Sequence, residues 1–159
     1  RYRHERFRRQ RQMCIRDRVT LVGVKDRPGV AASIFKPLSI NSINVDMVVQ
    51  NISPNGKETD LTFTIKAEDL NKTKKIIQEN KSINFKKVLF QKGVSKISII
   101  GVGMITTPGV TFRMFQALAN KKINIQVIST SEIKISVLIN KKDAKKALVT
   151  LHKEFKLQE

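Results

Sequence analysis

The feature that most constrains this 159-residue chain is an internal repeat. Pro28-Gly29-Val30 recurs as Pro108-Gly109-Val110, and Ile43-Asn44-Val45 recurs as Ile123-Asn124-Ile125, each at an offset of 80 residues. A repeat of this length corresponds to one compact domain, because the repeats of a solenoid are usually shorter and more numerous. The sequence therefore predicts two copies of one small domain, at residues 19–93 and 94–159.

The first copy shows a regular succession of strand and helix patterns. The expected elements are strands at 19–24, 43–52, 61–65 and 83–90, a helix that starts at Pro28-Gly29, and a helix at 69–80. The strands follow from alternating apolar residues and the helices from apolar residues at spacings of three and four. Asn55-Gly56 is a strong hairpin signal. The order βαββαβ predicts an α+β fold of the ferredoxin-like type, with an antiparallel sheet and two helices on one face.

The second copy repeats this order but ends before its last strand. Its expected elements are strands at 97–102, 123–130 and 133–139, a helix at 109–120, and a final helix that Asn140 is placed to cap. A ferredoxin-like domain without its fourth strand needs a strand from elsewhere. In the first copy Pro37 falls inside the first helix, where the second copy has Ala117. Proline removes an amide donor, so we expect this helix to bend or end early.

Positive charge is distributed unevenly along the chain. The formal net charge is +18, of which residues 1–18 contribute +6, because they hold eight arginines against Glu5 and Asp17. The other 141 residues contain 21 lysines but only two arginines. The string from Met13 to Arg18 also resembles a peptide made by translation through sequencing-adaptor DNA. We therefore interpret residues 1–18 as a non-native or disordered tail and leave them out of the prediction of fold and function.

Cysteine content and hydropathy favour a cytoplasmic protein. Cys14 is the single cysteine, which excludes an intramolecular disulfide framework and suits a reducing compartment. No apolar run approaches the roughly 20 residues needed to span a bilayer, and no signal-peptide pattern is present.

The turn between the first strand and the first helix, Asp26 to Ala31, is the clearest candidate for ligand binding. Free amide groups near Gly29, Val30 and Ala31 at a helix start suit a carboxylate, and Asp26 beside them suits an ammonium group. Together they match the two ends of a free amino acid. The alternative is a plain strand-to-helix turn, and the recurrence of the turn as Thr107-Pro108-Gly109-Val110 does not separate the two readings.

The motifs of both copies resemble the paired ACT domains in the regulatory region of aspartate kinase, over essentially all of residues 19–159. The strings that carry the resemblance are Asp26-Arg-Pro-Gly-Val-Ala-Ala32, Ile43-Asn-Val-Asp-Met47, Gln50-Asn-Ile-Ser53, Thr59-Asp60 and, most diagnostic, Ile128-Ser-Thr-Ser-Glu-Ile-Lys-Ile-Ser-Val137. The resemblance implies allosteric feedback inhibition, in which lysine, threonine or both bind between ACT domains and hold the kinase in a less active state.

The resemblance also implies a set of effector-binding residues. These are Asp26, Gly29, Val30, Ala31 and Gln50 from the first copy and Asn124, Ile125, Ser129, Thr130 and Ser131 from the second, with Asn44 and Asp46 ranked lower. Amide and hydroxyl side chains suit this task because they bind ligand groups without adding fixed charge. Each of them taken singly also fits a polar turn or strand-edge position. Thr107 stands where the family often has histidine, which puts the ligand preference of the second turn in doubt.

The resemblance places catalysis outside this chain. The family converts aspartate and ATP to aspartyl phosphate in lysine, threonine and methionine biosynthesis, but its glycine-rich kinase motif is absent here, and no catalytic or metal-binding residues are predicted. ATP and Mg²⁺ would belong to a kinase domain on a partner subunit or on a missing portion. The missing strand of the second domain would come from the segment just before residue 19, and we expect a homodimer formed through ACT domains.

Two other functions fit the sequence less well. RNA-recognition modules share the βαββαβ order and a positive charge, but they need aromatic residues on the central strands, where only Phe63 is found. A stand-alone ACT amino-acid sensor for another enzyme would lack the string from Ser129 to Val137. The sequence does not choose between lysine and threonine as the effector, or between a separate regulatory subunit and a fragment of a full kinase.

Overall fold

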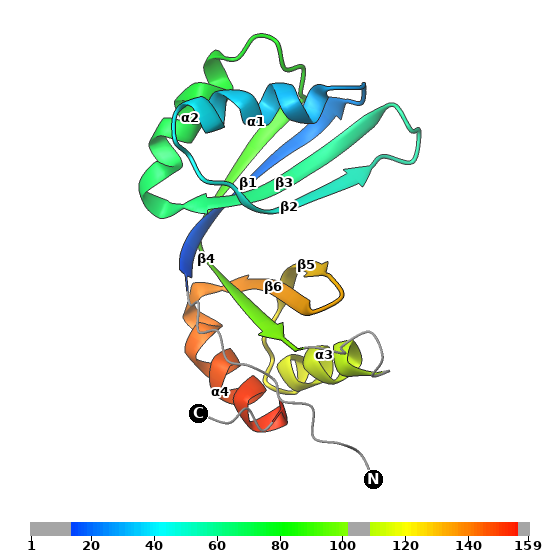
Figure 1. The fold of residues 1–159 in the computed structure, drawn as a ribbon, viewed down its shortest axis with the longest axis vertical. Coiled ribbons are helices and arrows are strands. Elements are labelled where there is room, and N and C mark those ends of the chain that lie inside the picture. Colours follow the sequence, from blue (N-terminus) through cyan, green and yellow to red (C-terminus); the bar gives the residue numbers. More distant parts are fainter. Residues whose placement is uncertain (1–13, 102–108, 156–159) are drawn as a thin grey trace. The chain divides into compact units, whose positions relative to one another are not determined.

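The computed structural model describes residues 14–101 and 109–155. In chain order the elements are β1 (Cys14–Lys25), α1 (Val30–Ile40), β2 (Asp46–Ile52), β3 (Glu58–Lys66), the 3₁₀ turn η1 (Ala67–Asp69), α2 (Leu70–Glu79), β4 (Lys87–Ile100), α3 (Val110–Asn120), β5 (Ile125–Thr130), β6 (Lys134–Asn140), the 3₁₀ turn η2 (Lys141–Asp143) and α4 (Ala144–Phe155). Of the described residues, 16–93 form one compact unit, and 94–155 together with 14–15 form the other. Figure 1 shows these elements in the colours of the sequence.

The first unit has the predicted ferredoxin-like architecture. Its strands lie in the order β2-β3-β1-β4, and both β1 and β2 run antiparallel to β3. The first part of β4 lies beside β1, and just before it the Lys86 amide donates to the Val22 carbonyl at 2.9 Å. Helices α1 and α2 cover one face of this sheet (Figure 1).

The second unit repeats this plan without a final strand of its own, as predicted. The second part of β4 pairs with β6, and β6 pairs with β5, all antiparallel. Helices α3 and α4 cover one face of this sheet (Figure 1). Asn140 accepts a hydrogen bond from the Lys142 amide at 3.1 Å, so it caps the 3₁₀ turn before α4. The described residues end with α4, and no described strand follows it.

Each unit has its own apolar core of 13 buried residues. Leu38 and Leu118 lie at equivalent positions in the two copies, and both side chains are fully buried. Burial of a leucine side chain contributes roughly 1.5–3 kcal/mol. Among the described residues the two cores thus match in number, although the second contains Ala117 and Ala147 and the first contains no alanine.

The start of β1 corrects the expectation of disorder for residues 14–18, the part of the predicted tail that the structure describes. Residues 14–18 belong to β1, and Arg16 to Arg18 pair with residues 64–66 of β3. The Asp17 side chain is 3% exposed and accepts a hydrogen bond from the Gly93 amide at 3.1 Å. Burial lowers the pKa of the Arg18 guanidinium below its ordinary value. Arginine stems cover a sheet well, which the argument from composition overlooked; residues 1–13 lie outside the described part of the chain.

Helix α1 contradicts the expectation that Pro37 ends it early. It runs on to Ile40 and is as long as α3, which has Ala117 at the equivalent position. A proline at 37 leaves the Ser33 carbonyl without its helical donor. The side-chain amide of Asn80 donates to this carbonyl at 3.4 Å, which replaces part of the lost bond.

Strand β2 starts later than its apolar pattern predicted. Ile43 is buried, but it lies in the loop before the strand, which begins at Asp46. The pairing with β3 shifts between Asp46 and Val49, and Met47 has a φ of 51°, which marks a β-bulge. The predicted hairpin at Asn55-Gly56 is confirmed, with a turn in which the Gly56 amide donates to the Ser53 carbonyl at 2.9 Å.

Candidate functional site

The turn from β1 into α1 is held in place by backbone hydrogen bonds. The Asp26 amide donates to the Lys57 carbonyl at 3.0 Å, which ties the turn to the β2–β3 hairpin. Gly29 precedes the helix with a φ of 84°, in the left-handed region. A Cβ at this position would meet nothing within 4 Å, so the dihedral angle rather than lack of space requires glycine here.

The first turn of α1 presents unused donors. No side chain caps the helix, and only the Val30 amide finds a partner nearby, the Arg27 carbonyl at 3.1 Å. The amides of Gly29 and Ala31 have no hydrogen-bond partner among the described residues. The Asp26 side chain is exposed and forms no ion pair within that part of the chain. This turn therefore offers donors and a carboxylate, the two groups that a free amino acid needs.

The topology brings Gln50 to the same end of the sheet as this turn. Strands β1 and β2 run in the same direction, because both are antiparallel to β3, so both finish at the end where α1 begins. Gln50 is exposed near the end of β2 and lies opposite Leu61. Of the predicted residues in the first unit, Asp26, Gly29, Val30, Ala31 and Gln50 are therefore brought to one end.

The two lower-ranked residues lie at the other end of β2. Asn44 is exposed in the loop before the strand, and Asp46 opens it, roughly 10–13 Å from Gln50 at the usual rise per residue. The Asp46 carboxylate lies 3.5 Å from the guanidinium of Arg16 and accepts the Met47 amide at 2.9 Å. These contacts give Asp46 a structural role at the bulge.

The predicted residues of the second unit also separate into two groups. Ser129 and Thr130 end β5, and the Ser131 amide follows with a bond to the Lys134 carbonyl at 2.7 Å. Asn124 and Ile125 lie at the start of the same strand, roughly 15 Å away at the usual rise. Within this unit the two groups do not converge on one small ligand. The turn residue Thr107 lies outside the described residues.

Serine side chains of the second unit form a row across its sheet. Ser98 and Ser136 are paired in register, and their hydroxyl oxygens are 2.7 Å apart. Ser129 lies opposite Ser136 on the next strand. The first unit has a similar pair at Thr20 and Thr62, with oxygens 3.1 Å apart. A hydroxyl pair at this register is thus a property of both sheets.

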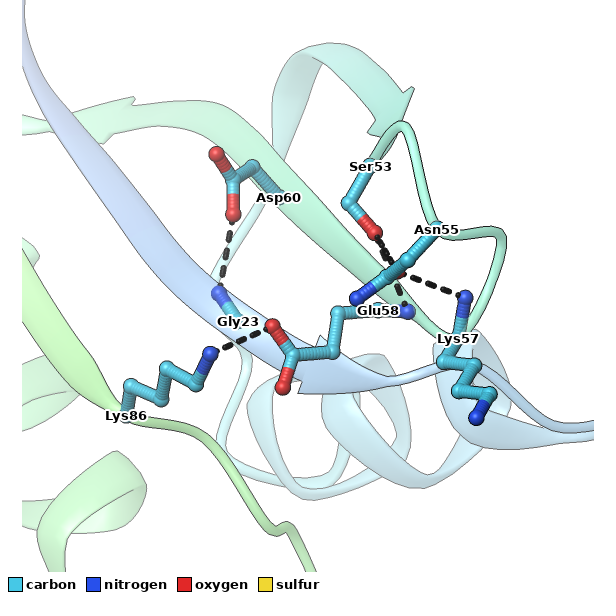
Figure 2. Close-up of polar contacts among 7 residues, drawn as sticks. All are labelled: Gly23, Ser53, Asn55, Lys57, Glu58, Asp60 and Lys86. Atoms are coloured by element: carbon cyan, nitrogen blue, oxygen red, sulfur yellow. Dashed lines mark hydrogen bonds and ion pairs between the residues drawn. The ribbon is translucent and has the colours of Figure 1, made fainter.

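Figure 2 shows a polar cluster in the first unit that the sequence argument missed. The strand β1 bulges at Gly23, whose φ is 67°, and its free amide donates to Asp60 at 2.8 Å. Lys86 donates to the Glu58 carboxylate at 2.6 Å. A cavity of about 350 Å³ lies beside this cluster, lined by Gly23, Lys25, Lys57, Glu58, Asn84 and Phe85. A glycine inside an alternating strand was the available signal, since it often marks a bulge.

The described residues give no sign of metal binding or membrane insertion. No group of three or more His, Cys, Asp or Glu side chains within residues 14–101 and 109–155 is placed to hold a metal ion. In the same residues, no helix has both the length and the apolar character needed to cross a bilayer.

Comparison with known proteins agrees with this architecture. The family model for the ACT domain matches residues 19–80 and 97–155. Aspartate kinase of Pseudomonas fluorescens is 45% identical over 141 residues, which cover 88% of this chain and 34% of that protein. The chain thus spans about a third of the length of this relative.

Two solved structures match along nearly their whole length. The crystal structure of aspartokinase alpha and beta subunits has a TM-score of 0.80 at 40% identity, over 89% of this chain and 93% of that one. The regulatory subunit of aspartate kinase from Thermus thermophilus, in its ligand-free form, has a TM-score of 0.79 at 34% identity, with the same two coverages. The chain belongs to the ACT-domain family. Its two domains correspond to the regulatory ACT region of aspartate kinases.

Proposed function

We propose that this chain binds lysine, threonine or both and thereby mediates feedback inhibition of an aspartate kinase. The observation that carries the proposal is the turn from Asp26 to Ala31, where unpaired amides and an exposed carboxylate lie side by side at a helix start. The similarity to a protein described as a regulatory subunit supports a regulatory role.

In this proposal the turn recognises the two groups common to all amino acids. The amides of Gly29 and Ala31 receive the carboxylate, helped by the dipole of α1, and Asp26 receives the ammonium group. Gln50 at the same end of the sheet supplies a neutral hydrogen-bonding group for the remainder of the effector, and Ser129 to Ser131 offer groups of the same kind in the second unit. The effector regulates only if it binds one arrangement of the kinase more tightly than the other.

The chemistry itself is assigned to a kinase domain outside this chain. That domain would bind ATP and Mg²⁺ and transfer phosphate to aspartate, in the pathway to lysine, threonine and methionine. The regulatory chain would act in the cytoplasm, as a homodimer formed through its ACT domains, because two cores of this size are each marginal alone. Light scattering at tens of micromolar, with effector present, should give the mass of a dimer or more; a monomer would contradict this part of the proposal.

Calorimetric titration with lysine and with threonine tests effector binding. Asp26→Ala should weaken binding of the true effector by about 10- to 150-fold, the loss expected when a charged hydrogen-bond partner is removed. Glu68→Ala is a matched control, because it removes an exposed carboxylate from the same unit far along the chain. Unchanged affinity in Asp26→Ala, or no binding of either amino acid to the unmodified chain, would overturn the assignment.

A further inference from the structure

The second unit carries a lysine-lined groove on its helical face. The groove lies between α3 and α4 and has a volume of about 740 Å³. Five lysines line it: Lys121 at the end of α3, Lys142 just before α4, and Lys145, Lys146 and Lys153 along α4. Spacings of three, four and seven residues place Lys142, Lys145, Lys146 and Lys153 on one side of α4 and the turn before it, with Val149 and Thr150 between the last two.

Most of these lysines lack a counter-charge. Lys146 lies 3.8 Å from the Asp143 carboxylate. The other four form no ion pair with any described residue. Glu154, the one acid in the lining, is bound to Arg113, whose Nε donates to it at 3.0 Å. The groove therefore presents several cations whose repulsion is not relieved within the described part of the chain.

The equivalent face of the first unit shows whether the fold itself requires positive charge at this place. Aligning η1 with η2 and α2 with α4 places Glu68, Asn71 and Glu79 where the second unit has Lys142, Lys145 and Lys153. Lys72 of the first unit stands at the position of Lys146. It donates to the Asn41 carbonyl at 2.7 Å and so joins the two helices. The fold therefore does not require a positive groove, and the charge of the second unit is a property of its own sequence.

The remainder of the lining favours a polypeptide over a nucleic acid. Val149, which is 49% exposed, and the edge of Ala117, which is only 8% exposed, form a narrow apolar strip beside the lysine stems. Among the described residues that line the groove there is no aromatic residue and no arginine. Single-stranded nucleic acid is usually bound by stacking on aromatic or arginine side chains. An amphipathic helix instead needs an apolar strip flanked by opposite charges.

We propose that this groove docks an acidic amphipathic helix of a partner polypeptide. Its carboxylates would face the lysines of α4, and its apolar residues would lie on Ala117 and Val149. Helix α4 has 12 residues and is therefore about 18 Å long, which matches a partner segment of about three turns. This interaction surface is separate from the turn at Asp26 and does not depend on effector binding.

A charge-exchange variant of the full chain tests the proposal. The probe is a fluorescein-labelled 16-residue peptide of Glu, Ala and Leu, with glutamates and leucines on adjacent helical stripes. The groove variant Lys142→Glu, Lys145→Asn, Lys153→Gln makes these positions neutral or acidic, as they are in the first unit; it removes three positive charges, adds one negative charge and so lowers the net charge by four. Fluorescence anisotropy at about 0.15 M salt should show at least tenfold weaker binding, since each exposed ion pair contributes modestly and three are lost.

A matched control separates the groove from the general positive charge of the chain. Lys81→Glu, Lys87→Gln, Lys92→Gln lowers the net charge by the same four units at exposed sites of the first unit and should weaken binding less than threefold. Equal weakening in both variants, or no peptide binding at 1 mM or so, would overturn the proposal. Tighter binding of a labelled 16-nucleotide RNA, lost in the groove variant, would overturn the choice of a polypeptide. If circular dichroism shows that the groove variant is unfolded, Lys145→Asn alone should still weaken peptide binding about threefold, and no change would count against the proposal.

Discussion

The two units of this chain share the backbone plan of the ACT domain, but different residues satisfy the hydrogen-bonding groups of that backbone. Both begin their first helix after a left-handed glycine, Gly29 with φ 84° and Gly109 with φ 87°, and neither helix has a side-chain cap. In both, the fourth residue after that glycine donates its amide to the glycine carbonyl, as Ser33 does to Gly29 at 3.0 Å and Arg113 does to Gly109 at 2.9 Å. The backbone geometry at this glycine and at the start of the helix is thus common to the two copies.

The bulge at the end of the first strand shows how the copies differ. The Gly23 amide is satisfied by the carboxylate of Asp60, whereas the Gly101 amide is satisfied by the backbone carbonyl of Ile133 at 2.9 Å. Asp60 therefore has a structural task that no acid performs in the second unit. By contrast, no such task is visible for Asp26 among the described contacts of its side chain. The comparison makes Asp26 the stronger candidate for ligand binding and removes Asp60 from consideration.

The largest expected difference in stability between the copies concerns a proline in the first helix of each unit. Ala117→Pro should lower the free energy of unfolding by about 3 kcal/mol or more, because it frees the Arg113 carbonyl and no donor replaces the lost amide. Position 154, equivalent to Asn80, is a glutamate that is already bound to Arg113. Pro37→Ala should change stability by only about 1 kcal/mol, since Asn80 already offsets part of the cost and proline restricts the unfolded chain.

Urea denaturation of each variant checks this asymmetry. The double variant Pro37→Ala, Asn80→Ala is the control, because the restored amide should make Asn80 less important for the Ser33 carbonyl. A gain of stability in Pro37→Ala as large as the loss in Ala117→Pro would mean that Asn80 does not compensate for the proline.

Pro37 also shows where the prediction from sequence reached its limit. The local rule for proline is sound, but the helix continues because Asn80, far along the chain, reaches the Ser33 carbonyl. Likewise, the alternation of apolar residues located β2 but could not show the bulge at Met47, which delays the strand. Elements, their order and the core followed from periodicity, since periodicity reflects burial directly.

The candidate site was predictable only in part, for a similar reason. The turn from Asp26 to Ala31 was found because its glycine and its free donors are local properties. The set from Asn124 to Ser131 was predicted as a group, yet its members lie at both ends of β5. An extended strand of this length keeps its two ends apart, so the grouping rested on the resemblance and not on the geometry of the predicted strand. The segment from Cys14 to Arg18 was misjudged because composition carries no information about strand pairing.

A smaller difference in stability between the copies is expected at the Gly23 bulge and at its counterpart Gly101. Asp60→Ala should cost about 1.5–3 kcal/mol, because it leaves the partly buried Gly23 amide without its charged acceptor. The equivalent change in the second unit, Lys134→Ala, should stay within about 0.5 kcal/mol, since Gly101 bonds to a backbone carbonyl that the substitution leaves in place. Urea denaturation checks both. Asp60→Asn keeps an acceptor oxygen and should recover part of the loss; if it is as damaging as Asp60→Ala, the bond to Gly23 is not the cause.

The smallest expected difference concerns the contact that ties the end of the second helix to the first helix of each unit. The first unit uses a neutral bond from Asn80 to the Ser33 carbonyl, whereas the second uses an ion pair between Arg113 and Glu154, whose side chains are 50% and 37% exposed. An exposed ion pair contributes less than about 1 kcal/mol, and salt screens it, because the Debye length falls from about 10 Å at 0.1 M to about 3 Å at 1 M. Glu154→Gln should therefore lower the free energy of unfolding by a few tenths of a kcal/mol at about 0.05 M salt and by almost nothing at about 1 M. Asn80→Ala should lower it by about the same amount at both salt concentrations. Arg113 also lies 4.9 Å from the Phe155 ring, a contact that Glu154→Gln leaves intact, so the salt dependence reports on the ion pair alone. Thermal unfolding in the two salts measures the difference, and an equal salt response of the two variants would show that the charge of the second contact has no role in holding its helices together.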